Sequence, residues 1–189
     1  MLKPPSLLLL WLLLLAGSAL AAPRHEETVF LFENRKVSLL VPETFGYASS
    51  KDDLGLVNVQ LAAPHDKVTL HLVFVPDPER QFASARARKE KMVELFQEYV
   101  DNSVEKAMQF EELEPKVGAG TYCVFTDASL AGKAPYPPGD FLHFTTGVKA
   151  WPGVVAIFRL FSNDTKSPEY QAAMKMIRES VQERGAPLK

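Results

Sequence analysis

The chain has 189 residues, of which 47% are hydrophobic and 23% are charged, and its formal net charge is −2. This near balance excludes the strongly basic face that nucleic-acid binding requires and the polybasic surface that binds anionic membranes. The single cysteine, Cys123, excludes an internal disulfide, so packing must stabilise the fold.

The first 21 residues have the pattern of a secretory signal peptide. Lys3 precedes an apolar run at residues 7–16, and the small residues Ala19 and Ala21 follow this run. A basic start, a short apolar centre and small residues at the −3 and −1 positions are typical of a cleaved leader rather than a membrane span. We expect cleavage after Ala21 and export of residues 22–189 as one periplasmic or secreted domain. Losing Lys3 from the 21 basic residues, against 23 acidic ones, leaves a charge of −3.

The first half of the exported chain predicts four short strands. In each, apolar residues alternate with polar ones or cluster between turn residues. The expected strands cover residues 28–33, 36–41, 57–61 and 67–75. The polar stretch at residues 43–53 predicts a loop.

The pattern then changes to the three- and four-residue spacing of an amphipathic helix. Neither Gly nor Pro interrupts residues 82–110, so we predict one long helix with Leu95 and Phe96 on its buried side. Three further strands and a last helix follow. The strands are expected at residues 122–126, 141–149 and 154–161, and Ser167-Pro168 supplies the cap and first position of the helix.

The resulting order is β-β-β-β-α-β-β-β-α. Strands joined by short turns predict a mostly antiparallel sheet, which two amphipathic helices would cover. We therefore predict an α+β fold in which two main helices cover a sheet of about six to seven strands, an α/β/α sandwich.

Three features carry a resemblance to a known group. They are the opening hairpin that ends Leu39-Leu40-Val41-Pro42-Glu43, the long helix after Pro78, and the hairpin at residues 141–161 before the last helix. In this layout the chain resembles the PsbP/DcrB-like group of small extracytoplasmic α/β/α sandwiches. The resemblance covers most of the exported chain and includes no specific motif, so it assigns no functional residue. The group also includes a photosystem accessory protein and a nuclear-import factor that binds a small GTPase, so this fold does not decide function.

The sequence contains no motif for catalysis, a metal or a cofactor. It has no G-x-S-x-G, no phosphate-binding glycine loop, and no H-x-H or H-E-x-x-H. The apolar neighbours of Cys123 favour a structural thiol over a nucleophile. His71 and His143 could meet across a sheet and bind zinc with Asp140, but ordinary surface or hydrogen-bonded histidines are favoured. We expect no catalytic residue, no metal site and no cofactor.

Two features point to binding. Arg159 lies in an otherwise apolar strand, where a buried arginine must be paired or must bind an anion; a simple salt bridge or an edge position is the alternative. Prolines at residues 134–140 fix a loop that displays Tyr136, and this loop is either a recognition surface or a rigid connector. The candidate partner-binding residues are Pro135, Tyr136, Pro137 and Asp140.

These observations predict a non-enzymatic extracytoplasmic accessory or binding protein that engages an envelope protein partner. The alternative is a carrier or sensor of a small apolar or anionic ligand, held between the sheet and the long helix near Arg159. A polar-lined cavity between helix and sheet would favour the carrier. A solid core with an exposed aromatic patch would favour the protein partner.

Overall fold

The computed structural model describes residues 23–184. The signal peptide expected at residues 1–21 therefore lies outside the described residues. Within the described range, no helix is both long enough and apolar enough to cross a membrane.

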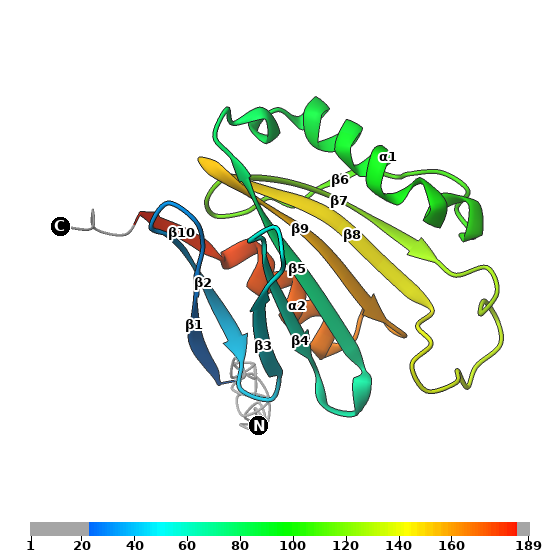
Figure 1. Cartoon of the computed structure of the whole chain (residues 1–189). Helices are drawn as coiled ribbons and strands as arrows, with labels where there is room; N and C mark the ends of the chain where they lie inside the picture. The colour runs from blue at the N-terminus through cyan, green and yellow to red at the C-terminus, as the bar shows by residue number, and fades with distance from the viewer. Residues whose placement is uncertain (1–22, 185–189) are drawn as a thin grey trace, which may run out of the picture.

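The fold is built on a seven-stranded antiparallel sheet with the order β3-β4-β5-β9-β8-β7-β6 (Figure 1). The central strand β9 pairs with β5 on one side and with β8 on the other. Of these neighbours, β8 is joined to β9 by a tight turn, after which Gly153 begins β9 at φ 82°. The strands are β3 (Gly46–Lys51), β4 (Val57–Ala62), β5 (Val68–Asp77), β6 (Glu111–Glu112), β7 (Ala119–Thr126), β8 (His143–Trp151) and β9 (Gly153–Ser162).

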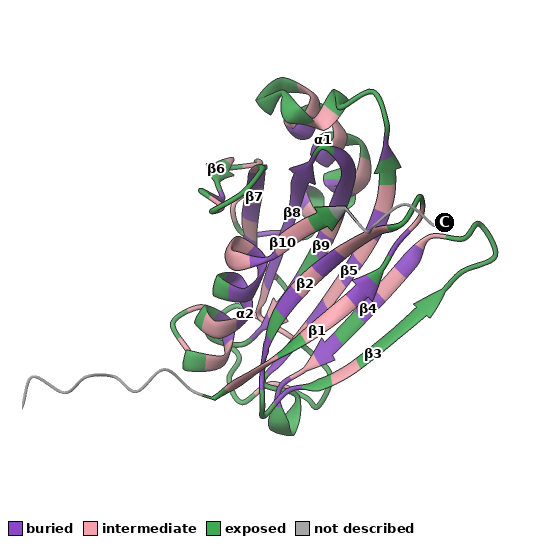
Figure 2. Cartoon of the chain, turned by 90° about the vertical axis from the view of Figure 1, so that its left-hand side faces the viewer, coloured by how far each residue is buried: buried purple, intermediate pink, exposed green. Residues whose placement is uncertain are grey.

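One face of this sheet is covered by a second, three-stranded sheet and by helix α2 (Pro168–Glu179) (Figures 1 and 2). The second sheet has the order β1-β2-β10, with β1 at Arg24–Phe30, β2 at Arg35–Pro42 and β10 at Val181–Arg184. Its inward side chains share one apolar core with the main sheet and α2. Representative members of this core are Val37, Leu39, Leu61, Leu70, Phe158, Met174 and Ile177.

The opposite face carries helix α1 (Ala85–Asn102), which lies over β7 and β8 (Figure 1). Met92 and Phe96 are fully buried there, in a second apolar core with Cys123 and Val148. The Ser84 side chain caps the helix by accepting a hydrogen bond from the Ala87 amide. Two short 3-10 turns, η2 (Pro64–Asp66) and η3 (Gln81–Ala83), flank β5.

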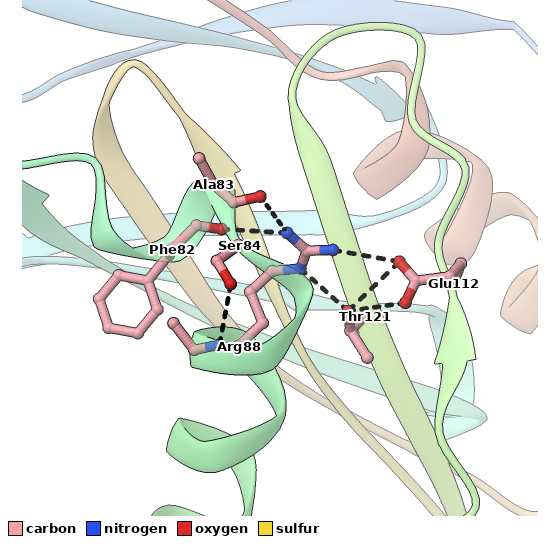
Figure 3. Close-up of polar contacts among 7 residues, drawn as sticks. Phe82, Ala83, Ser84, Arg88, Glu112 and Thr121 are labelled. Atoms are coloured by element: carbon pink, nitrogen blue, oxygen red, sulfur yellow. Dashed lines mark hydrogen bonds and ion pairs between the residues drawn. The ribbon is translucent and has the colours of Figure 1, made fainter.

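Buried Arg88 fastens the start of α1 to the sheet (Figure 3). Its guanidinium donates to the Phe82 and Ala83 carbonyls at 3.1 and 2.9 Å and to Thr121 Oγ1 at 2.9 Å. It also forms an ion pair with Glu112 at 3.1 Å. One side chain thus ties η3 and α1 to β7 and to the edge strand β6.

The predicted fold class is confirmed: the molecule is α+β, with a mostly antiparallel sheet and two main helices. The strand order differs in detail, because the opening hairpin joins β10 in a separate sheet. The loop expected at residues 43–53 contains β3, an edge strand whose small polar side chains stay largely exposed.

The long helix predicted over residues 82–110 was wrong in extent, because α1 ends at Asn102. Ser103 adopts an extended backbone, and its hydroxyl accepts from the Lys106 amide. The Val104 amide then donates to the Thr126 carbonyl, which draws the chain alongside β7 instead of continuing the helix. Leu95 is partly buried and Phe96 is fully buried.

Candidate functional site

A groove of about 340 Å³ lies between α1 and the part of the sheet formed by β4, β5 and β9. Polar and apolar side chains line it on the face that α1 occupies. Its principal lining residues are Asn58, Gln60, His71, Val73, Leu95, Ile157 and Arg159.

Strand register explains how the polar groups meet. Gln60 pairs with His71 across β4 and β5, and His71 pairs with Arg159 across β5 and β9. Because directly paired residues project from the same face of a sheet, these three side chains form one row. The neighbouring row on that face holds Asn58, Val73 and Ile157, so apolar side chains of β5 and β9 lie beside the polar row.

Of the alternatives weighed for Arg159, the structure shows an exposed side chain rather than a buried one. The strand is apolar in sequence because of neighbours such as Phe158 and Leu160. Their side chains lie on the other side of the sheet, where both are fully buried. The guanidinium carbon of Arg159 lies 5.7 Å from the centre of the Phe96 ring. No carboxylate among residues 23–184 forms a salt bridge with it.

The groove is electropositive. Burial, followed by the charge of Arg159, lowers the pKa of His71 and favours the neutral imidazole. Of the described residues that line the groove, none is acidic, and the guanidinium of Arg159 is the permanent charge. A neutral histidine and a glutamine amide beside an arginine supply hydrogen-bonding groups around one cation.

A second pocket, of about 300 Å³, lies where α1 ends. Tyr99, Phe141, Phe144 and Phe161 line it together with Asp127 and Asp140. Of the four loop residues expected to bind a partner, Asp140 lines this pocket, whereas Pro135, Tyr136 and Pro137 are not among its lining residues. Tyr136 is partly buried, and the other three are exposed. Arg159 and Asp140 thus belong to different pockets.

The two histidines do not meet. His71 is on β5 and His143 is on β8, with β9 between them. Thr146, which pairs with Arg159, projects from the same face of the sheet as Arg159, and His143 lies three residues before it on the opposite face. Among the described residues, no group of three or more His, Cys, Asp or Glu is placed to hold a metal ion.

Cys123 is fully buried in the α1-side core, and burial raises the pKa of its thiol to about 12. Its neighbours in the strand therefore indicated its environment correctly.

Sequence reasoning missed a buried lysine, Lys149, on the other face of the sheet. Its ammonium donates to the carbonyls of Ile177 and Ser180 at 2.7 and 2.8 Å, and it lies 4.7 Å from the centre of the Trp151 ring. Burial lowers the pKa of Lys149 to about 7. Because it is fully buried and bonded to the end of α2, its role is to fasten that helix end to β8.

The row formed by Gln60, His71 and Arg159 was also missed. Alternation in the sequence places Gln60 and His71 away from the apolar core, but only the pairing of β5 with β9 brings them beside Arg159. No protein-family model, curated protein or solved structure matches the chain.

Proposed function

We propose that this protein is a non-catalytic binding protein that holds a small organic anion in the groove between α1 and strands β4, β5 and β9. The observation that carries this proposal is Arg159, an arginine without a salt bridge to any described carboxylate, in a groove lined by no described acidic residue. The polar-lined space between helix and sheet favours the carrier alternative over a protein that binds an envelope protein partner.

The two rows of the groove match a ligand with two chemically different ends. The planar guanidinium of Arg159 suits a carboxylate, which it can bind through two parallel hydrogen bonds. Gln60 and His71 offer further hydrogen bonds to the same end. Val73 and Ile157 from the sheet, with Leu95 from α1, contact the apolar end of the ligand.

Isothermal titration calorimetry with octanoate, using octanol as the neutral counterpart, tests this proposal. Octanoate is expected to bind more tightly than octanol, and Arg159→Gln should weaken octanoate binding about 10- to 100-fold, as expected for a lost charge-assisted bond. Arg86→Gln, at an exposed arginine on α1, is the matched control and should change nothing. Equal affinity for octanoate in wild type and Arg159→Gln would contradict the proposal.

We propose further that the protein acts outside the cytoplasm, in the periplasm or as a secreted chain, after cleavage behind Ala21. The basic start, the short apolar run and the Ala19-Leu20-Ala21 ending support this. An accessory role of the kind found in the PsbP/DcrB-like group is consistent with it. The intact mass of the exported protein should match a chain that begins at Ala22, and a retained leader would contradict the proposal.

An envelope protein partner is the second candidate, supported by the loop at residues 134–140. Tyr136 remains partly exposed between prolines that restrict the backbone, an arrangement that lowers the entropic cost of recognition. Tyr136→Ala should leave the fold intact and reduce recovery of a protein partner from an extract of the source organism. Equal recovery by wild type and variant would leave the loop as a connector.

A further inference from the structure

The pocket at the end of α1 combines aromatic rings with carboxylates. Its aromatic side chains come from α1, β7, β8, β9 and the segment before β8, and its acidic side chains are Asp127 and Asp140. Among the described residues that line this pocket, none is basic. It therefore has the opposite electrostatic character to the Arg159 groove.

We propose that this pocket binds an organic ammonium group. A cation is attracted to the face of an aromatic ring, and recognition of alkylated ammonium groups by several rings together is the established use of this force. Nearby carboxylates add a charge that favours the same ligand. The pocket adjoins the anion groove, because the ring centroids of His71 and Phe161 are 5.8 Å apart, but the two sites share no lining residue.

The rings form one continuous aromatic cluster. The centroids of Tyr99 and Phe144 are 4.0 Å apart, those of Phe144 and Phe161 are 4.8 Å apart, and those of Phe141 and Phe161 are 5.7 Å apart. Phe144 is buried, which anchors the cluster in the α1-side core, whereas Tyr99, Phe141 and Phe161 are only partly buried. The cluster thus keeps aromatic surface available to a ligand on a rigid base.

The two acidic residues are held by their surroundings. An Asp127 carboxylate oxygen accepts from the Ser129 amide at 2.7 Å, and the Asp127 amide donates to the Leu142 carbonyl at 2.8 Å. The Asp140 amide donates to the Pro137 carbonyl at 3.1 Å, and its carbonyl accepts from Asn163 at 3.3 Å. Within residues 23–184, neither carboxylate forms a salt bridge, so their charge is not neutralised by a neighbouring basic side chain.

The dimensions of the pocket limit the ligand. A volume of about 300 Å³ lies at the lower end of the range for small-molecule sites. It suits an ammonium head with a short substituent. This chemistry has two sources, a free amine or the side chain of a lysine in a polypeptide, and the experiment must distinguish them.

Nuclear magnetic resonance titration with phenyltrimethylammonium chloride, against sodium chloride at equal ionic strength, tests the proposal. Wild type should show saturable shifts at residues lining the pocket. Asp127→Asn keeps the oxygen that accepts from Ser129 but removes the charge, and Tyr99→Leu removes a ring. Each should weaken binding about 3- to 30-fold, the range that such contacts supply.

Asp53→Asn, at an exposed acid in the β3–β4 loop, and Tyr99→Phe, which keeps the ring, are the matched controls and should bind as wild type does. Arg159→Gln should also retain ammonium binding, which separates this site from the anion groove. Absence of saturable shifts, or equal affinity in wild type, Asp127→Asn and Tyr99→Leu, would overturn the proposal.

A lysine-containing peptide with blocked ends, titrated beside butylammonium, identifies the source. Tighter binding of the peptide by tenfold or more, on the order of 1.4 kcal/mol, would assign the ammonium to a polypeptide partner. Equal or weaker binding of the peptide would assign it to a free amine.

Discussion

Replacing Arg88 by methionine should destabilise the fold substantially, although Arg88 does not line the anion groove. The substitution keeps an unbranched stem and removes the guanidinium. That group donates to the carbonyls of Phe82 and Ala83, to the Thr121 hydroxyl and to the Glu112 carboxylate (Figure 3). Breaking a buried ion pair by deleting one partner costs about 3–5 kcal/mol. Because the Glu112 side chain is 50% exposed and can regain water, we expect about 2–4 kcal/mol.

Urea denaturation followed by circular dichroism measures this change. Arg86→Met is the matched control, since Arg86 lies two residues earlier on α1 and pairs only with Glu90 at the surface. It should leave the midpoint unchanged. The reasoning fails if Arg88→Met is no more destabilising than Arg86→Met, because the buried contacts would then contribute no net stability.

The remaining predictions concern side chains in the interior of the fold. Cys123 should react slowly with a thiol reagent in the folded protein and rapidly once unfolded, because burial raises the pKa of its thiol to about 12; rapid native labelling would contradict this. Met92→Ala should cost about 2–5 kcal/mol on denaturation and Leu95→Ala less, because only Met92 is fully buried; the reverse order would contradict the packing. Lys149→Met should lower the denaturation midpoint, because it deprives the Ile177 and Ser180 carbonyls of their donor. Burial lowers the pKa of Lys149 from 10.5 to about 7, so between pH 7 and pH 10.5 the unfolded chain binds more protons than the folded one. The difference in unfolding free energy between wild type and Lys149→Met should therefore rise with pH in this range. A difference that falls with pH would contradict the lowered pKa.

The sequence indicated the faces of individual strands well. Alternation in residues 57–61 and 67–75 placed Gln60 and His71 opposite the buried leucines, as the structure shows. It could not bring them beside Arg159, because β5 and β9 pair across a long stretch of intervening chain. The groove is therefore a product of sheet order, which local periodicity does not contain.

The helix prediction failed for a related reason. Phe110 continued the apolar spacing of α1, and like Met108 it packs against the same core, but from chain that follows the helix end. Lys106 lies between them and the helix, with φ 54°. Apolar residues beyond a helix can thus continue its spacing in the sequence, because they pack into the same core from the segment that follows the helix. The strand β3 was missed because an exposed edge strand carries no apolar pattern.

The most direct test of the anion-binding account follows the Arg159 side chain itself. Nitrogen-15 correlation spectra of the arginine Nε–H groups, recorded during titration with octanoate, report on each guanidinium separately. The account predicts a saturable shift of the Arg159 signal with little change at Arg86 and Arg80, together with shifts at the His71 and Gln60 side chains. An Arg159 signal that stays in place while octanoate binds elsewhere, or that moves no more than the signals of Arg80 and Arg86, would contradict it.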